Sequence, residues 1–578
     1  MSSRALFCLF WTTACIPDPA EYAGTDDPRR DYDRDGQSEE DGDCAPNDPF
    51  VWGGAPEYCD GKDNGCSGAT WSAAAEEGVA TWIDSTGLPT DITGAWFTGT
   101  EASPAEVHIT EPGTLRVCSG TQYATVHVEA AGVSIEGFAS IPDVPPTLSG
   151  AEAVPVLVVD APNGVTAISD LTLADGHFAD SQPAGGISQH AGELIVTDST
   201  LTGHVGDEGG ALHIGGHTTL ARVRITESHT PYESPGGGGV FVAPGATLEA
   251  DALDVVGCFS FTVEDRDADS ATKGGGLYNQ GTTSVRRSTF DNNQSTLGAG
   301  LSNTSELHIE DSTIRDCISS QGGGLWTGPD SITHVQGVTM SGNASSFSGD
   351  GGGIYNQGTL TIDTSDLVDN YATNNGGGVY NDTSGTITAT EVLVSTNFAT
   401  SGGNISDRGV SSWTDGAIMG GVAHNGGGVF TFEGGHTTLH HVAIWSNRVR
   451  LPDPDDDSNF GLGGGGLLVF GGTITCTADD SFIGPDHLTK APVIASNRSE
   501  RHPVGGVMLM VEYVINESNF TSDGCIFGAG DRANTPIQLA ADLGGKYYDV
   551  AGLEVAIDCT REECLCDGEP CPEVVLDE

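Results

Sequence analysis

A short phrase, two or three glycines followed by an aliphatic residue, returns throughout the chain and restricts its possible folds more than any other feature. The segment from Gly351 to Asn381 begins and ends on this phrase, as GGGIYN and GGGVYN. From Leu277 to Val429 the phrase returns every 24 to 29 residues. A repeat period of about 20 to 50 residues is typical of solenoid architectures. The aliphatic positions are Ile187, Leu212, Val240, Leu277, Leu301, Leu325, Ile354, Val379, Ile405, Val429, Leu467 and Val507.

A second phrase lies inside many repeats, an apolar residue followed three positions later by asparagine. Between the two phrases apolar and polar residues alternate, as in TLTIDTS from Thr359 to Ser365. This is the period of a strand, and the repeat shows no 3.6-residue pattern of an amphipathic helix. Short strands separated by turns rich in Gly, Asn and Ser are therefore predicted. The pairs are Phe290/Asn293, Met340/Asn343, Leu367/Asn370, Val394/Asn397, Ile444/Asn447 and Ile494/Asn497.

Stacking of successive repeats converts this pattern into a parallel β-helix. Each strand would pair with its equivalents about 4.8 Å above and below. Inward Ile, Leu and Val would form the core, and the asparagines of one column would bond to backbone groups and to each other. We predict an all-β, right-handed parallel β-helix over residues 105–555, with about 17 coils if each coil takes roughly 25 to 28 residues. Residues 71–104 would form a cap or first coil, and residues 556–578 a cysteine-rich acidic tail.

The two phrases resemble the GG[ALVI] and FxxN repeats of the chlamydial polymorphic outer-membrane proteins. The segment from Thr114 to Phe138, TLRVCSGTQYATVHVEAAGVSIEGF, is similar to opening coils of the pectate-lyase-like β-helix superfamily. The resemblance covers most of the chain and implies a β-helix. It implies little about function, because one fold hosts many unrelated activities.

The charge balance restricts the possible partners. The chain holds 22 Lys and Arg against 81 Asp and Glu, a formal net charge of −59. Such a surface is expected to repel nucleic acid and anionic membranes, and to favour solubility and cation binding. We therefore expect no nucleic-acid partner.

The first 15 residues predict an export signal. They place one positive charge at Arg4, an apolar run from Ala5 to Trp11 and small residues before Cys15. The segment resembles a bacterial lipoprotein signal, which implies that Cys15 carries a lipid anchor in the outer membrane. An ordinary signal peptide cleaved nearby is the alternative. Either signal would deliver the protein to the bacterial cell envelope, at the outer-membrane surface, or secrete it.

Twelve cysteines remain after Cys8 and Cys15, and four of them crowd the tail CTREECLCDGEPC. In a cytosolic protein this spacing would suggest zinc. In an exported acidic chain it favours disulfide bonds. We expect the bridges to close the last coil, whose open edge would otherwise invite edge-to-edge association.

Residues 16–70 form a separate acidic module. In DYDRDGQSEEDGD three aspartates alternate and a glycine follows, so their carboxylates can converge on one hard cation. Calcium takes six to eight oxygen ligands of this kind. The alternatives are a solvated acidic linker and a transition-metal site. The predicted ligands are Asp31, Asp33, Asp35, Gln37 through its backbone carbonyl, Asp41 and Asp43.

The same module resembles an acidic, cysteine-containing metal-binding repeat of surface proteins such as the copper-associated MopE family. Ala45, Gly53, Gly65 and Ser67 depart from the repeat, so its second half would bind a cation weakly or serve as a disulfide-linked turn. The matching positions are Asp31, Asp33, Asp35, Gly36, Asp43, Cys44, Glu57, Cys59, Asp60, Gly61, Asp63, Asn64 and Cys66.

Three functions are compatible with these features. The leading hypothesis is an exported, lipid-anchored β-helix rod that acts as an adhesin, binds a polysaccharide or another cell-surface component, and carries calcium in its acidic loops. The second is a carbohydrate-active enzyme, either a polysaccharide lyase or a glycoside hydrolase, which would need two or three converging carboxylates. The third is a structural spacer of the envelope. The sequence assigns no catalytic residue.

Overall fold

The computed structural model describes residues 27–67, 76–179, 182–231, 234–260, 271–346, 348–432, 434–450 and 464–477, and shorter segments between 493 and 574. The predicted signal and its Cys15 lie outside these residues. The chain divides into two compact units, Met1–Glu76 and Glu77–Glu578. The first unit contains one short 3₁₀ helix, η2 (Glu39–Asp41), among its described residues and is otherwise built of turns.

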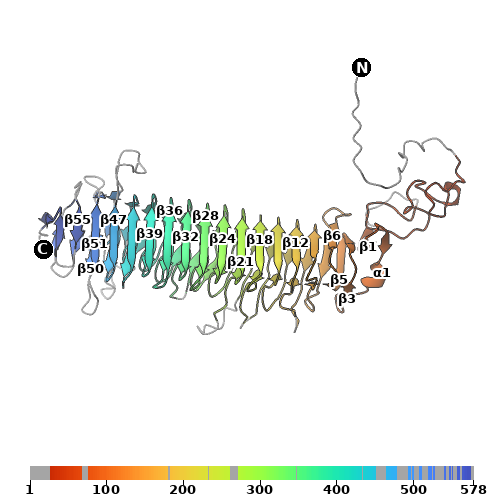
Figure 1. Ribbon diagram of the computed structural model, residues 1–578, viewed down its shortest axis with the longest axis horizontal. Helices are drawn as coiled ribbons and strands as arrows, with labels where there is room; N and C mark the ends of the chain where they lie inside the picture. The colour runs from red at the N-terminus through yellow and green to blue at the C-terminus, as the bar shows by residue number, and fades with distance from the viewer. Residues whose placement is uncertain are drawn as a thin grey trace, which may run out of the picture. The chain divides into compact units, whose positions relative to one another are not determined.

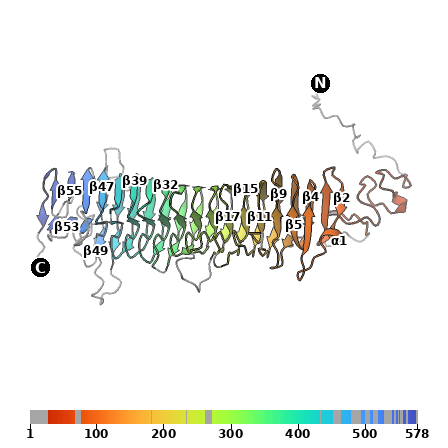
Figure 2. The ribbon, with the colours of Figure 1, turned by 60° about the horizontal axis from the view of Figure 1, so that its bottom comes forward.

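The second unit is a β-solenoid, and the predicted all-β parallel β-helix is confirmed. Its strands stack along one axis from β4 at one end to β55 at the other (Figures 1 and 2). The chain is 49% strand and 2% helix. The solenoid has about 12 turns, fewer than the predicted number of coils. Several coils are longer than assumed: the register steps 37 residues from Val240 to Leu277, and 40 from Leu467 to Val507.

The glycine phrase leads into the first of three parallel stacks. Its aliphatic residues pair in register, for example Ile354 with Val379, and are fully buried. The strands are β8 (Leu157–Val159), β11 (Ile187–Gln189), β14 (Leu212–Ile214), β17 (Val240–Val242), β20 (Leu277–Asn279), β23 (Leu301–Asn303), β27 (Leu325–Thr327), β31 (Ile354–Asn356), β35 (Val379–Asn381), β38 (Ile405–Asp407), β42 (Val429–Phe432), β46 (Leu467–Phe470) and β50 (Val507–Met510).

The second stack contains the five-residue strands predicted from alternation. In β32, Leu360 and Ile362 are buried while Thr359 is exposed. The strands are β9 (Val165–Ser169), β12 (Glu193–Thr197), β15 (His217–Ala221), β18 (Thr247–Asp251), β21 (Thr282–Arg286), β24 (Glu306–Glu310), β28 (Ile332–Gln336), β32 (Thr359–Asp363), β36 (Thr386–Thr390), β39 (Val410–Thr414), β43 (His436–His440), β47 (Thr473–Thr477) and β51 (Asn519–Asp523).

Where the second phrase occurs, its apolar residue lies at the centre of a strand of the third stack, as Leu367 does in β33. The strands are β7 (Pro146–Ser149), β10 (Thr172–Ala174), β13 (Thr200–Thr202), β16 (Arg224–Thr226), β19 (Asp254–Val256), β22 (Thr289–Asp291), β25 (Thr313–Arg315), β29 (Thr339–Ser341), β33 (Asp366–Val368), β37 (Leu393–Ser395), β40 (Ala417–Met419), β44 (Ala443–Trp445), β48 (Val493–Ala495) and β52 (Ile526–Phe527).

Short two-residue strands follow the third stack in several coils and form two small parallel sheets. Isolated bridges through Phe398 connect these sheets into one corner column, because Phe398 pairs with Tyr371 on one side and with Val422 on the other. The strands are β26 (Ile318–Ser319), β30 (Ala344–Ser345), β34 (Tyr371–Ala372), β41 (Val422–Ala423), β45 (Arg448–Val449) and β49 (Arg498–Ser499).

The glycines of the repeat are required at the corner before the first stack. Gly351 and Gly376 have φ values of +66° and +64°, a conformation that L side chains rarely adopt. A Cβ on Gly352 would overlap the carbonyl oxygens of Gly377 and Tyr371. At Gly352 neighbouring coils therefore approach too closely for a Cβ, although the buried Ala299 fills the equivalent place in another coil.

The asparagines of the second phrase form the predicted ladder. Asn343 Nδ2 donates to Asn370 Oδ1 at 3.0 Å, and Asn370 Nδ2 donates to Asn397 Oδ1 at 3.0 Å. Asn370 Nδ2 also donates to the Met340 carbonyl of the preceding coil at 3.0 Å. These side chains are buried, so the ladder satisfies the polar backbone of the corner where water is excluded.

Irregular coils precede the first complete turn. Strand β5 is long enough to pair with β7 through its first half and with β8 through its second. Strand β3 pairs in parallel with β5, and β4 pairs with β6. The elements are β1 (Ala80–Asp84), β2 (Pro89–Asp91), α1 (Thr93–Trp96), β3 (Ala105–Ile109), β4 (Gly113–Cys118), β5 (Gly120–Val128) and β6 (Val133–Phe138).

At the C-terminal end the parallel pattern stops. Strand β55 pairs with β51 in the antiparallel direction, and β54 pairs with β53 in the same way. Disulfides join Cys559 to Cys564 and Cys566 to Cys571, as expected for a tail that covers the last coil. The strands are β53 (Leu539–Ala541), β54 (Lys546–Tyr548), β55 (Ile557–Cys559), β56 (Cys564–Cys566), β57 (Glu569–Pro570) and β58 (Glu573–Val574).

Of the cysteines that the structure describes, ten are disulfide-bonded, Cys59 and Cys118 among them. Cys476 is joined to Cys525, a separation of 49 residues. Cys258 and Cys317 are free and buried. Each of these two thiols follows an apolar core residue by three positions, so it occupies a place in the ladder column that asparagine fills elsewhere.

Candidate metal centre

Three aspartates of the first unit converge as the sequence predicts. Asp31, Asp33 and Asp35 each offer a carboxylate oxygen, and these oxygens lie within 4.8 Å of one another. The loop that holds them turns at Arg34, with φ +68°, and at Gly36, with φ +103°. Alternation thus brings the three carboxylates to one side of a tight loop.

Backbone N–H groups of this loop bond to one oxygen of Asp33 and one of Asp35, and to both oxygens of Asp31, whose Oδ2 accepts from the Gly36 N–H at 3.1 Å. Asp31 Oδ1 accepts a hydrogen bond from the Arg34 N–H at 2.6 Å, and Asp33 Oδ1 accepts one from the Asp35 N–H at 3.2 Å. Asp35 Oδ1 accepts from the Gln37 N–H at 2.7 Å. Such local bonds are typical of aspartate in turns, and they fix the direction of the second oxygen of Asp33 and Asp35.

The remaining oxygens are buried without a hydrogen-bond partner. They are Oδ2 of Asp33, Asp35 and Asp43 and Oε1 of Gln37. Asp43 is only 5% exposed, and its Oδ1 accepts from the Ala45 N–H at 2.8 Å. A buried acceptor without a partner is costly, and four in one loop indicate that something else binds them. We name Asp31, Asp33, Asp35, Gln37 and Asp43 the acidic loop site.

The charges of this site repel one another. Burial raises the pKa of Asp33, and the nearby carboxylates of Asp35, Asp43 and Asp31 raise it further. Burial likewise raises the pKa of Asp43, with added repulsion from Asp35, Glu39 and Asp31. Both shifts have the direction expected for crowded, partly buried carboxylates, and a divalent cation would offset this repulsion.

Asp41 and Gln37, the other two predicted ligands, differ from the aspartates in their surroundings. The side chain of Asp41 is exposed, and its Oδ2 accepts a hydrogen bond from Ser38 Oγ at 2.7 Å. The amide oxygen of Gln37 is buried without a partner, while its Nε2 donates to the Gly53 carbonyl at 3.3 Å. Gly42, with φ +113°, lets the chain return from η2 to Asp43.

The second half of the module uses its acidic groups internally. Glu57 accepts from the Asn64 and Gly65 N–H groups at 3.2 and 3.0 Å. Asn64 is fully buried, and its Oδ1 accepts from the Tyr58 N–H at 3.0 Å. The Cys44–Cys66 disulfide connects this half to the acidic loop site. This arrangement agrees with the disulfide-linked turn, one of the two alternatives for this half.

A second group of ligand-type side chains was not predicted from the sequence. Glu106, His108 and His127 of the solenoid unit offer ligand atoms within 4.8 Å of one another. The sequence did show that Glu106 and His108 are two residues apart, a spacing that places two ligand-type side chains on one face of a strand. Their partner His127 lies 19 residues later, which is shorter than any spacing of the glycine phrase.

Fold and site together define a class: a β-solenoid protein with a small, disulfide-bonded acidic module whose geometry suits a hard cation. No family model, curated protein or solved structure matches the chain. Among the residues that the structure describes, no helix has the length and apolar character needed to cross a membrane.

Proposed function

We propose that this protein is an exported, lipid-anchored β-helix rod of the bacterial cell surface, that its acidic loop site binds calcium, and that the rod binds a polysaccharide or another cell-surface component. The observation that carries the proposal is the set of four buried side-chain oxygens without partners in Asp33, Asp35, Gln37 and Asp43. They belong to one loop, and three of them come from carboxylates.

Calcium suits this donor set better than other common cations. All the available donors are oxygens, and calcium accepts six to eight of them at 2.3 to 2.6 Å in flexible geometry. Magnesium demands a near-ideal octahedron and keeps several waters. Transition metals prefer nitrogen or sulfur, which the acidic loop site does not offer. Affinity should be modest, about 10⁻⁴ to 10⁻³ M, the range of extracellular modules.

Disulfide usage supports export. Ten of the twelve cysteines in the described part of the chain are disulfide-bonded, among them both pairs of the tail and the pair that closes the acidic module. Bonds of this number persist in oxidising compartments. The lipid anchor at Cys15 remains a proposal that rests on the signal-like sequence alone.

A corner column of exposed aromatic residues supports a glycan partner. Tyr371 and Phe398 are 43% and 36% exposed, and their rings stack in adjacent coils at 5.4 Å with an interplanar angle of 3°. Ile318, 41% exposed, lies in the same column. Exposed apolar surface of this kind marks interaction sites. The exposed parts of these two parallel rings offer apolar surface against which the C–H groups of a sugar ring can pack.

Limited proteolysis tests the calcium proposal. Calcium should slow cleavage in residues 27–43 of the wild-type protein, because the cation removes the repulsion among the carboxylates and orders the loop. The variant Asp33→Asn with Asp35→Asn should be cleaved at the same rate with calcium or with a chelator. Cleavage within the solenoid should not change in any sample.

The matched control is Glu39→Gln with Glu40→Gln, which removes the same charge from exposed side chains of the same loop. It should retain the protection by calcium. If calcium protects neither wild type nor control, the acidic segment is a solvated linker and the proposal is wrong. If the Asp33/Asp35 variant is protected as strongly as wild type, the site lies elsewhere.

A further inference from the structure

We propose that Glu106, His108 and His127 form a second metal site, in the first coils of the solenoid, that binds Zn²⁺. The inference does not depend on the calcium proposal, since it concerns other residues, another unit of the chain and another class of metal.

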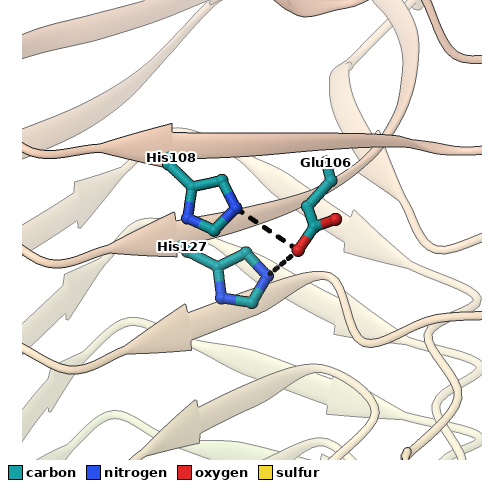
Figure 3. A group of neighbouring side chains, drawn as sticks. All are labelled: Glu106, His108 and His127. Atoms are coloured by element: carbon teal, nitrogen blue, oxygen red, sulfur yellow. Dashed lines mark ion pairs between the residues drawn. The ribbon is translucent and has the colours of Figure 1, made fainter.

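The fold brings the three side chains together through strand register. Glu106 and His108 alternate in β3 and therefore point to the same face of the sheet. His127 in β5 is the direct parallel partner of His108. The two imidazole rings stack at 4.6 Å with an interplanar angle of 9°. Figure 3 shows both rings directed with one nitrogen toward the same carboxylate oxygen.

The distances are close to those of a bound zinc ion. Glu106 Oε1 lies 3.3 Å from His108 Nε2 and 3.6 Å from His127 Nε2. Zinc bonds of about 2.0 to 2.2 Å in tetrahedral geometry separate ligand atoms by roughly 3.3 to 3.6 Å. The remaining His–His separation is below 4.8 Å, so a small rotation of the rings would complete the site.

Glu129 orients the first histidine for this role. Its Oε1 lies 2.7 Å from His108 Nδ1, so the Nδ1–H donates to the carboxylate and Nε2 is left as the ligand atom. A carboxylate on the far nitrogen is the usual outer partner of a zinc-bound histidine.

The donor set selects the class of metal. Two imidazoles and one carboxylate suit zinc and similar borderline ions, whereas calcium binds oxygen ligands. Three protein ligands leave a fourth position for water or for a group of a bound partner. Glu106 and His108 are 69% and 47% exposed, so a metal can reach the site from solvent.

The solenoid contains a similar histidine pair that serves as a comparison. His308 and His334 are register partners in β24 and β28, and their rings stack at 4.7 Å. His308 Nε2 lies 3.2 Å from Glu306 Oε1. Within the described residues, Glu306, His308 and His334 do not bring three ligand atoms within 4.8 Å of one another. This pair therefore has the stacked rings without the convergent geometry.

Zinc titration by calorimetry tests the site on the full chain, with excess calcium present to occupy oxygen sites. Wild type should bind one zinc ion with the highest affinity. His127→Val, which introduces the residue that the next coil carries in this column at Val158, should abolish that binding step. Glu129→Gln should weaken it by roughly 10- to 100-fold, as expected for loss of an outer partner.

His334→Thr is the matched control, because the next coil of that column carries Thr361. It should leave the tight zinc step unchanged. Circular dichroism should show that each variant is folded, and Co²⁺ absorption should show nitrogen ligation in wild type and its loss in His127→Val. If His127→Val binds zinc as wild type does, or if only His334→Thr loses the tight step, the assignment is wrong.

Discussion

His204 replaces asparagine in the ladder column and introduces a buried titratable group. It is fully buried; its Nδ1 accepts from the Gly176 N–H at 3.0 Å, and its Nε2 lies 3.0 Å from the Leu173 carbonyl. Burial lowers the pKa of His204 from 6.5 to about 4. The neutral ring, with its proton on Nε2, satisfies both bonds, and protonation would break the bond from Gly176.

We therefore predict a pH-dependent loss of stability that this residue causes. Above pH 6.5 the ring is neutral in both the folded and the unfolded chain, so its titration does not change the free energy of unfolding. Between 6.5 and 4 the unfolded chain takes up a proton that the folded chain does not, so the free energy of unfolding falls as the pH falls. The total loss should be about 3 kcal/mol, from 1.36 kcal/mol per pKa unit.

Thermal denaturation of wild type and His204→Asn across this pH range measures the effect. Asparagine fits the column, as Asn343 and Asn370 show, and it does not titrate. The difference in melting temperature between the two proteins should change between pH 6.5 and pH 4 and be constant above it. Parallel curves over the whole range would contradict the prediction.

Single residues also show what sequence alone could predict about the sites. Asp31, Asp33 and Asp35 were predicted together because their spacing in a turn suffices to bring them together. His108 and His127 were missed, because their contact depends on the length of one irregular coil. For Gln37 the sequence suggested its backbone carbonyl as a ligand; the structure adds the buried amide oxygen, whose position depends on the contact of Gln37 Nε2 with the Gly53 carbonyl and not on spacing.

At the scale of the repeat, the close packing at the glycine corner predicts that an added methyl group will destabilise the solenoid. Gly352→Ala should destabilise the solenoid by about 1 to 3 kcal/mol or more, as overpacking of a tight interior does. The new methyl group would overlap carbonyl oxygens of its own coil and the next, which are held by the parallel strands on both sides. Melting temperature measured by circular dichroism reports the change.

Gly94→Ala is the control for the glycine corner. Gly94 lies in α1, and a Cβ there would meet no atom within 4 Å. Alanine is the better helix former, so this variant should melt at the wild-type temperature or slightly above. A Gly352→Ala protein as stable as the wild type would show that neighbouring coils can move apart at the corner.

The elements of the regular coils were predictable, because each coil repeats the same local pattern. The glycine phrase, the alternating strand and the asparagine phrase each occupy one stack, as expected. The number of coils was overestimated, since insertions such as the one between Val429 and Leu467 add residues without adding a turn. The antiparallel ending at β55 and the long strand β5 each occur once, so no repeated sequence pattern predicted them.

At the scale of the whole solenoid, the exposed corner column predicts how a glycan should bind. Tyr371→Ala with Phe398→Ala should weaken binding to a polysaccharide at least several-fold, because both stacking surfaces are lost. Affinity of wild type should rise with the length of the oligosaccharide, since Ile318 extends the same column over further coils. Glycan arrays followed by calorimetry measure both effects.

Ile332→Ala with Val410→Ala is the matched control for the corner column. These side chains are 47% and 54% exposed but belong to the second stack. They should be dispensable for glycan binding. Equal loss in both variants would indicate non-specific adhesion to apolar surface, and absence of any bound glycan would favour a purely structural spacer.

The in-register columns also have an evolutionary consequence. Because Ile354 meets Val379, Asn356 meets Asn381 and Asn370 meets Asn397, one coil can replace its neighbour in each stack without a change of contacts. Duplication or loss of one complete repeat in a gene would then lengthen or shorten the rod by about 4.8 Å, while leaving both ends intact. The length of the solenoid would vary in discrete steps, each set by a single recombination event.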